Sequence, residues 1–591
     1  MFDSSIGNNT VLSPYGGKTL RTETEGMAAL IPTLGKETTT CSIMSYGFNP
    51  VISSWSPYHG SIYAVVESIA KIVAMGGDYK TIRFSFQEYF EKLLNNPVKW
   101  GKPFAALLGA YRVQKELCLP SIGGKDSMSG SFEDLDVPPT LVSFAITHQD
   151  VKNIITPELK GANHVLVEVM LEKDQYHLFD FAQLQNEYSK VQELMKNGKV
   201  FSAYTVKDGG VLEAVYKMAF GNNIGVEVSK QCNLSSLTAR NYGNIILEVE
   251  NASVVEYLNA RVIGYTNDSM NVTYQNEVIT LEDAYNRNAS VLEKVYPTSE
   301  VAPTKEVVVG NYVNRPTVKA KVQYDEVNVV IPVFPGTNCE YDSKRAFEKA
   351  GAKVELVVIR NKTEKDIKDS INDLTAAIKK AQIMMIPGGF SAGDEPEGSG
   401  KFIATFLRNE SLKEAITDLL DNRDGLMIGI CNGFQALIKL GLLPYGKIMR
   451  LSKEDATLTF NTIGRHVSQM VNTRIASVNS PWLAKVNVGD IHTIPVSHGE
   501  GRFVAPDKVL KELFENGQVF TQYVDNSNNP TMVSPFNPNG SMMAIEGIVS
   551  RNGRVLGKMG HSERQGDNRF VNIYGEMDQL LFEAGVSYFK K

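Results

Sequence analysis

The chain has 591 residues, of which 43% are hydrophobic. At roughly 100–200 residues per domain, this length predicts three to five domains, and the composition is typical of folded rather than disordered protein. The net charge of −6 is spread along the chain and not gathered into basic clusters, which argues against nucleic acid as a partner.

Cysteine usage and the first residues indicate the compartment. The five cysteines are far apart and include no C-x-x-C pair, so we expect neither a disulfide framework nor a zinc site, and we predict a cytoplasmic protein. No apolar run approaches the ~18–20 residues of a membrane span, and a signal peptide is not evident. Because no strand or amphipathic helix precedes the turn-rich stretch that begins at Ser13, we expect Met1 to begin a fragment or one subunit of a larger assembly.

A first block, residues 1–158, mixes helix and strand. Ser61 to Met75 predicts a helix that Gly76 and Gly77 end in the manner of a glycine C-cap. Further helices are predicted over 86–94 and 103–117, and a strand over 141–147.

A second block covers residues 159–300. Its predicted elements are a strand over 164–170, a helix over 182–196, a helix over 211–220 and a strand over 245–249. The turn Lys207-Asp208-Gly209-Gly210 opens the second of these helices, and a glycine turn at a helix start offers backbone N–H groups to an anion.

The third block, residues 326–591, follows a segment over 301–325 that is rich in Pro, Thr and Val and that we interpret as a linker. Apolar strands alternate with helices in this block. The predicted strands are 327–333, 353–359, 383–386 and 426–430. This alternation predicts an α/β domain with a mostly parallel sheet that is covered on both faces.

The sequence Gly429-Ile430-Cys431-Asn432-Gly433 joins the last of these strands to a predicted helix, 434–440. A sharp strand-to-helix turn of this kind exposes a nucleophile, and its flanking glycines leave no room for Cβ atoms. The helix N-terminus favours the thiolate of Cys431. The alternative is a buried cysteine that acts only as a small apolar residue.

Two further motifs favour the catalytic interpretation. The backbone N–H groups that the turn Pro387-Gly388-Gly389-Phe390-Ser391 offers after its proline, with that of Asn432, can hold an oxyanion. His561 and Glu563 are two apart, so on an extended segment they point the same way. His561 can then act as the base for Cys431 while Glu563 orients the imidazole.

With these motifs, the third block resembles the class I glutamine amidotransferases, and more narrowly the glutaminase domain of the phosphoribosylformylglycinamidine synthases. The matching stretches, in the family's order, are Pro335–Cys339, Gly388–Asp394, Gly429–Gln435, Ser497–Arg502 and His561–Arg564. The resemblance implies a thiolate attack on the amide carbon of glutamine, followed by release of ammonia and hydrolysis of the thioester.

The resemblance also implies which residues contact glutamine. Gly389, Phe390 and Asn432 are expected at the oxyanion, and Gln435 and Glu500 near the substrate. Glu500 suits the α-ammonium group, although a solvated loop carboxylate is the alternative. His498 is left open between substrate contact and a structural role, and Cys339 is interpreted as structural.

The upstream blocks resemble the second half of the synthetase region of the same family, an aminoimidazole-ribonucleotide-synthetase-like unit. The matching stretches are Gly16–Lys18, Ser85–Phe90, Gly123–Ser129 and Asp208–Gly210. The resemblance implies an α/β and α+β multidomain chain, ATP or ADP with magnesium as cofactors, and a missing N-terminal synthetase half as partner.

Residues for an auxiliary nucleotide site follow only from this resemblance. They are Glu67, Lys71, Lys125, Ser127, Lys207 and Asp208. Glu67 is a possible magnesium ligand, but Lys71 stands where the family has an amide, and Thr205 where it has an aspartate. We therefore hypothesise that Lys71 and Lys207 supply the charge that magnesium supplies elsewhere. The alternatives are a surface lysine at Lys125 and a solvated i,i+4 ion pair between Glu67 and Lys71.

The predicted function is a ligase of purine biosynthesis. It would convert formylglycinamide ribonucleotide to its amidine with glutamine as nitrogen donor and ATP as energy source. Two alternatives remain: a glutaminase subunit of another synthetase, and a scaffold half that only completes a partner's active site.

Overall fold

The computed structural model describes residues 3–33, 36–300, 306–316, 319–393 and 399–591. The chain separates into two compact units. The N-terminal unit comprises Asn9–Val291 and Asp567–Tyr574, and the C-terminal unit comprises Met1–Asn8, Leu292–Gly566 and Gly575–Lys591. Residues 301–305 and 317–318 of the predicted linker, and Asp394 of the predicted glutaminase motif, lie outside the described residues.

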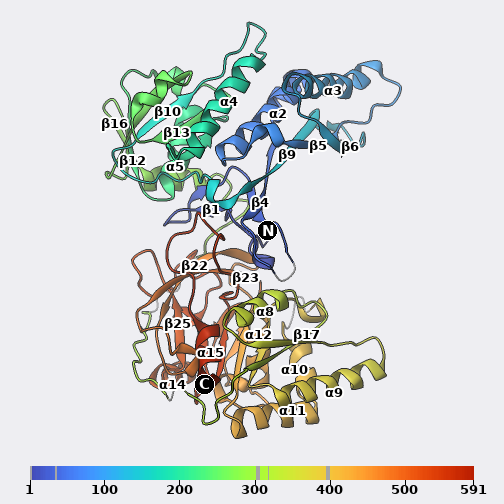
Figure 1. Ribbon diagram of the computed structural model, residues 1–591, viewed down its shortest axis with the longest axis vertical. Coiled ribbons are helices and arrows are strands. Elements are labelled where there is room, and N and C mark those ends of the chain that lie inside the picture. Colours follow the sequence, from blue (N-terminus) through green and yellow to red (C-terminus); the bar gives the residue numbers. More distant parts are fainter. Residues whose placement is uncertain (1–2, 34–35, 301–305, 317–318, 394–398) are drawn as a thin grey trace. The chain divides into compact units, whose positions relative to one another are not determined.

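The first sheet of the N-terminal unit has the strand order β3-β4-β9-β5-β6. Helices α2 (Pro57–Ala74) and α3 (Pro97–Leu117) pack together, and α2 lies along β4 and β9 (Figure 1). The strands are β3 (Met27–Leu30), β4 (Thr40–Gly47), β9 (Thr140–Asp150), β5 (Arg83–Tyr89) and β6 (Ser121–Lys125). Nearly every residue of α2 is buried, which explains its apolar sequence.

Large apolar side chains project from the opposite face of this sheet. Residues alternate between the two faces of a strand, and in β4 and β9 the inward set is buried against α2 while the outward set is exposed. The exposed set includes Met27, Met44, Tyr46, Phe144 and Ile146. We call these five residues the open apolar face.

The helix predicted over 86–94 is wrong. Residues Arg83–Tyr89 form strand β5, which pairs with β9 on one side and β6 on the other. Phe84, Phe86 and Glu88 are buried while Arg83 and Tyr89 are exposed. This period of two is the strand signal, and pairing on both edges outweighs the helix propensity of the glutamine and glutamate.

The second sheet of the N-terminal unit has the order β11-β13-β10-β14-β12-β15-β16. Alternate residues of β10 pack on α4 (Phe181–Lys196) and on α5 (Gly210–Phe220), so the two helices cover opposite faces. The strands are β11 (Val200–Thr205), β13 (Ile245–Val249), β10 (Val165–Val169), β14 (Ala260–Asn267), β12 (Gly225–Val228), β15 (Asn271–Tyr274) and β16 (Glu277–Thr280).

The C-terminal unit is built on one large sheet with the order β18-β17-β19-β20-β27-β26-β25-β22-β23. Its strands are β18 (Lys353–Val358), β17 (Asn328–Val333), β19 (Ile383–Ile386), β20 (Leu426–Ile430), β27 (Val555–Lys558), β26 (Ile545–Val549), β25 (Val519–Tyr523), β22 (Val467–Ile475) and β23 (Ile491–His498). The predicted strands and their βαβ connections are confirmed.

The sheet is parallel from β18 to β27 and antiparallel from β27 to β23. The expected parallel arrangement thus holds for the half that carries the cysteine. Helices α8 (Glu340–Lys349), α9 (Glu364–Lys380) and α12 (Asn432–Leu440) flank this half (Figure 1). Within the described part of the chain, none of the helices has the length and hydropathy that crossing a membrane requires.

Candidate active site

Strand β20 ends at a strained turn that presents Cys431. Its backbone has φ 53° and ψ −107°, a conformation that residues with a side chain rarely adopt. The flanking glycines are obligatory, because a Cβ on Gly433 would lie 2.0 Å from the Ile386 carbonyl oxygen and one on Gly429 would lie 2.6 Å from Leu437 Cδ1. The turn is therefore a nucleophile elbow.

The Cys431 thiol is buried and protonated at rest. Its sulfur donates to the Ser497 carbonyl oxygen at 3.5 Å. Burial raises the pKa of the thiol to about 12, although Arg564 and the Asn432 N–H lower it. The N–H at the helix N-terminus lowers the pKa of the thiol, as expected, but desolvation outweighs it in the resting site. Cys431 accordingly needs a base.

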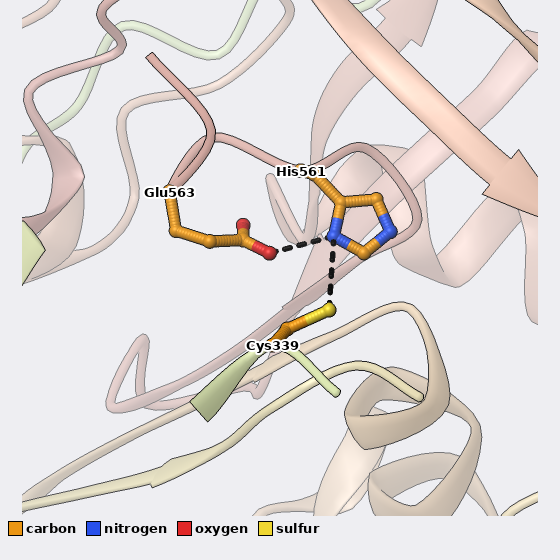
Figure 2. Close-up of side chains that lie close together, drawn as sticks. All are labelled: Cys339, His561 and Glu563. Carbon is orange, nitrogen blue, oxygen red and sulfur yellow. Dashed lines mark hydrogen bonds and ion pairs between the residues drawn. The ribbon is translucent and has the colours of Figure 1, made fainter. Parts of the chain in front are cut away.

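His561 and Glu563 lie on the loop after β27. Glu563 Oε1 accepts from His561 Nδ1 at 2.6 Å, and both side chains are fully buried (Figure 2). Burial and the Arg564 charge lower the pKa of His561 and outweigh Glu563, so the ring is neutral. Among the described residues, His561 Nε2 has no hydrogen-bond partner. The imidazole is neutral, is held in place through Nδ1 and leaves Nε2 without a partner. This is the arrangement that a general base requires.

A buried lysine holds this loop in place. Lys558 at the end of β27 donates to the Gly560 carbonyl oxygen at 3.1 Å and to Ser562 Oγ at 2.7 Å. Ser562 Oγ in turn donates to Gln579 Oε1 at 2.6 Å. Glu546 lies 3.5 Å from the ammonium group and compensates its charge. The loop that carries the base is thereby fixed to the sheet.

Gly388 lies between Cys431, Cys339 and His561. A Cβ at this position would come 2.9 Å from His561 Cε1, 3.1 Å from Cys339 Sγ and 3.4 Å from Cys431 Cβ. The absence of a side chain at Gly388 is what allows these groups to approach one another. The sequence motif contained this glycine, but sequence reasoning did not identify it as a site residue.

The turn after β19 offers fewer oxyanion donors than predicted. The Phe390 N–H donates to the Gly336 carbonyl oxygen at 2.9 Å, so it is committed within the turn. Gly389, with φ 147°, and Asn432, whose N–H bonds the Cys431 sulfur, are the remaining backbone donors of the predicted set. The Phe390 ring is partly exposed. The structure therefore corrects the assignment of Phe390 as a donor.

The predicted glutamine-binding residues gather beside the elbow. Gln435 Oε1 accepts from Asn432 Nδ2 at 3.0 Å, and Gln435 Nε2 donates to the Glu500 carbonyl oxygen at 2.8 Å. Glu500 Oε2 accepts from the Ser399 N–H at 3.1 Å, whereas Oε1 is buried and has no partner among the described residues. Glu500 is thus a buried carboxylate with one oxygen available, not a solvated loop residue.

His498 is held within the protein. Its Nδ1 is 3.2 Å from Asn461 Oδ1, and its Nε2 is 3.4 Å from Asn539 Nδ2. Complete burial lowers the pKa of His498 to about 3, which keeps the ring neutral. These contacts support the structural role that was one of the two alternatives.

Two residues outside the predicted catalytic set, Cys339 and Arg564, adjoin His561. Arg564 is buried and donates from Nη2 to Cys339 Sγ at 3.0 Å, and Cys339 Sγ lies 4.0 Å from His561 Nδ1. Cys339, His561 and Glu563 have the donor atoms of a metal site (Figure 2). They do not fit a cation, because the guanidinium group already faces the sulfur and Nδ1 is bonded to Glu563.

Some of the candidate nucleotide residues in the N-terminal unit belong to a charge-compensated cluster. It consists of Glu67, Lys71, Lys207 and Glu25, and we call it the Glu67 cluster. Lys71 Nζ lies 2.7 Å from Glu67 Oε1 and donates to the Tyr46 carbonyl oxygen at 2.8 Å, with both charged side chains buried. Lys207 Nζ lies 2.8 Å from Glu25 Oε1. Burial lowers the pKa of Lys207, but Glu25 and Glu67 outweigh this and raise it. The predicted i,i+4 ion pair between Glu67 and Lys71 is present, but it lies on a buried face of α2 and not on a solvated one.

The other predicted nucleotide residues are dispersed. Lys125 is exposed on β6, and Ser127 Oγ bonds Ser129 Oγ at 2.9 Å. Asp208 accepts from Asn49 Nδ2 at 3.2 Å and lies near the exposed Arg240. Among the described contacts, none joins Lys125 or Ser127 to the Glu67–Lys71 pair.

Comparisons with known proteins agree with the glutaminase geometry. Residues 326–589 match the CobB/CobQ-like glutamine amidotransferase domain. Phosphoribosylformylglycinamidine synthase subunit PurQ of Methanococcus maripaludis is 39% identical over 277 residues, which cover 43% of this chain and 92% of the relative. The PurQ subunit of Aquifex aeolicus is 33% identical over 249 residues, which cover 42% and 94%.

A solved structure, Thermotoga maritima PurL complexed with FGAR, is 14% identical and has a TM-score of 0.36. The match covers 53% of this chain and 52% of that one, so this chain spans about half of its length. The PurQ relatives, in contrast, are matched along almost their whole length at more than 30% identity. The chain belongs to the PurQ family of phosphoribosylformylglycinamidine synthase subunits.

Proposed function

We propose that the C-terminal unit hydrolyses glutamine to glutamate and ammonia. The ammonia serves the ATP-driven conversion of formylglycinamide ribonucleotide to formylglycinamidine ribonucleotide. The observation that carries the proposal is the pairing of a strained, buried Cys431 with a neutral His561 whose Nε2 is unpartnered. Membership of the PurQ family supports the same reaction.

Acylation begins at the buried thiol. His561 Nε2 takes the proton of Cys431 as the sulfur attacks the amide carbon of glutamine, because the thiol does not ionise by itself at neutral pH. The N–H groups of Gly389 and Asn432 stabilise the negative oxygen of the tetrahedral intermediate. The imidazolium ion then protonates the amide nitrogen, the C–N bond breaks, and ammonia leaves a γ-glutamyl thioester on Cys431.

Deacylation uses the same groups in reverse order. His561 takes a proton from water, the resulting hydroxide attacks the thioester, and the C–S bond breaks to give glutamate and the Cys431 thiol. Glu563 stays bonded to Nδ1 and stabilises the imidazolium that forms in each half-reaction. Glu500 Oε1 accepts a hydrogen bond from the α-ammonium group of glutamine. This role accounts for a buried carboxylate oxygen that has no partner among the described residues.

Hydroxylamine trapping tests the covalent step. Incubation of the chain with glutamine and hydroxylamine should yield γ-glutamyl hydroxamate in place of part of the glutamate, since hydroxylamine competes with water for the thioester. We expect a low rate from the chain alone, because docking of a synthetase partner completes the site. Glutamate release without any hydroxamate, over a range of hydroxylamine concentrations, would contradict a thioester route.

We propose further that the N-terminal unit is the second half of the synthetase and docks with the first half. Support comes from the upstream sequence motifs and from the open apolar face, where large side chains of neighbouring strands are exposed together. The counterpart half is the occupant we assign to this face. Conversion of formylglycinamide ribonucleotide with free ammonia and ATP should then require that half.

A change on the open apolar face tests this assignment. Phe144→Asp should prevent co-elution of the chain with the first half in size-exclusion chromatography, since the charge would be buried in the interface. Tyr176→Asp is the control, because Tyr176 is also exposed, at 65% against 39% for Phe144, but lies outside the face. If both variants bind alike, the face is not the docking surface.

Magnesium does not fit at Glu67. One of its carboxylate oxygens lies against Lys71, and the other accepts from the Phe48 N–H at 3.3 Å. The buried lysines instead support a cluster that needs no metal, and no step of the reaction is assigned to it. The scaffold alternative remains for this unit alone: it predicts that glutamine hydrolysis is measurable while no variant of the Glu67 cluster alters synthesis.

A further inference from the structure

The short segment Asp3–Asn8 lies far from the triad in sequence but is part of the C-terminal unit. Arg564 Nη1 donates to Asp3 Oδ2 at 2.6 Å and to Ser5 Oγ at 2.7 Å. Asn8 Nδ2 donates to the Gln565 carbonyl oxygen at 2.9 Å. The segment therefore bonds directly to the two residues that follow Glu563.

Arg564 needs a counter-charge because it is 2% exposed. A buried guanidinium ion without a partner is costly. Among the described residues, Asp3 is the carboxylate within hydrogen-bond distance of it, whereas Asp342 is 3.9 Å from Nε. The residues 326–589 that match the amidotransferase family do not include Asp3. The amidotransferase region thus takes this charge from elsewhere in the chain.

The segment is itself held in one conformation. Asp3 Oδ1 accepts from the Ser5 N–H at 2.9 Å and from Ser5 Oγ at 2.7 Å. The Gly7 N–H donates to Asp342 Oδ2 at 3.2 Å, and Arg345 donates to the Gly7 carbonyl oxygen at 3.1 Å. Arg564 lowers the pKa of Asp3 and outweighs its burial, so the carboxylate is ionised.

Besides Asp3 and Asp342, Glu563 is a buried carboxylate whose charge acts on Arg564. Its Oε1 bonds His561, and its Oε2 is buried without a partner among the described residues. If Asp3 were neutral, the guanidinium group would turn to Glu563 and compete with the imidazole for that carboxylate. The orienting bond of the triad would then weaken.

We propose that Asp3, assisted by Ser5, is a positioning residue of the glutaminase site that acts through Arg564 to keep Glu563 on His561. The proposal rests on the proposed function of the triad. It implies that glutamine hydrolysis depends on residues that precede the N-terminal unit in sequence. An amidotransferase region cut out of this chain would lack them.

The charge on Asp3 also affects the proton affinity of the base. The charged and titratable groups that face His561 are Glu563, Arg564, Asp3, Cys339, Cys431, His466 and His498. Glu563 and Asp3 raise the pKa of His561, and Arg564 lowers it. Removing the Asp3 charge should lower this pKa further.

The test is glutamine hydrolysis by the full chain over a range of pH. Asp3→Asn should lower kcat about 10- to 100-fold with KM within about twofold, because the base is misplaced while the substrate pocket is intact. The acid limb of the kcat/KM profile should move to lower pH, since that limb reports the base. Asp3→Glu should recover part of kcat. Asp373→Asn, at an exposed pair with Arg360, is the matched control and should behave as the parent chain.

A double-mutant cycle guards against simple misfolding. In an Arg564→Met background, Asp3→Asn should add little to the loss, because the group through which Asp3 acts is gone. Additive losses, or a lower kcat with an unmoved acid limb, would show a merely structural role and overturn the proposal. If the parent chain releases no glutamate at all, the proposed function fails instead.

Discussion

The triad in the C-terminal unit and the Glu67 cluster in the N-terminal unit are both buried and rich in charge, yet they differ in one respect. The triad and its substrate-binding residue Glu500 keep polar atoms that have no partner among the described residues: His561 Nε2, Glu563 Oε2 and Glu500 Oε1. In the Glu67 cluster, Glu67 and Glu25 are each paired with a lysine. Unsatisfied buried atoms cost stability and are retained where a substrate satisfies them. The contrast distinguishes a site built for a ligand from one that is internally compensated.

The largest effect should come from Cys431→Ser. Loss of the thiol should reduce glutamine hydrolysis at least about 1000-fold, because a hydroxyl in this buried elbow is a much poorer nucleophile. Glutamate release measures it. Cys118→Ser, at an exposed cysteine in the N-terminal unit, should keep the parent rate. A Cys431→Ser chain that still releases ammonia from glutamine would show that the triad is misassigned.

Lys71→Met tests the compensated cluster. It should lower the free energy of unfolding by about 3 kcal/mol, since Glu67 would remain buried without its counter-ion. Lys344→Met removes the same charge from the exposed i,i+4 pair with Glu348 and should cost less than about 0.5 kcal/mol. Denaturant unfolding compares the two. Equal small losses would mean that the buried pair contributes nothing to stability. A rise in the Tm of the parent chain with ADP and magnesium would contradict the assignment of the Glu67 cluster as metal-free.

Gly388→Ala should lower kcat about 10- to 100-fold, because the added Cβ would lie 2.9 Å from His561 Cε1 and displace the base. Steady-state kinetics with glutamine measures the loss. A Cβ on Gly101, in helix α3, meets nothing within 4 Å, so Gly101→Ala provides the control. Unchanged kinetics in Gly388→Ala would mean that nucleophile and base do not meet at this glycine during turnover.

The smallest effect concerns substrate recognition. Glu500→Gln should raise KM for glutamine about tenfold and change kcat little, since a neutral amide loses the ion pair with the α-ammonium group. Glu515→Gln, at an exposed pair with Lys511, should leave both constants unchanged. A fall in kcat at constant KM would instead place Glu500 in the chemistry.

The sequence predicts the triad because its signals are local. The glycines around Cys431, the apolar strand before it and the spacing of His561 and Glu563 are visible within short windows. The prediction for residues 86–94 is wrong because pairing on two edges decided the structure there. The prediction at Cys431 overestimated the helix N-terminus, because burial depends on the whole unit and raises the pKa of that thiol.

By itself, the sequence determined most of the elements, the elbow and the family, since each depends on periodicity, turn chemistry or a short motif. Only the tertiary structure decided which groups are paired. Arg564 bonds Asp3 across more than 500 residues, Lys207 bonds Glu25 across more than 100, and the missing side chain of Gly388 lets Cys431 and His561 approach each other. Such contacts leave no local pattern, because a buried charge is compensated by whichever residue the fold brings within reach.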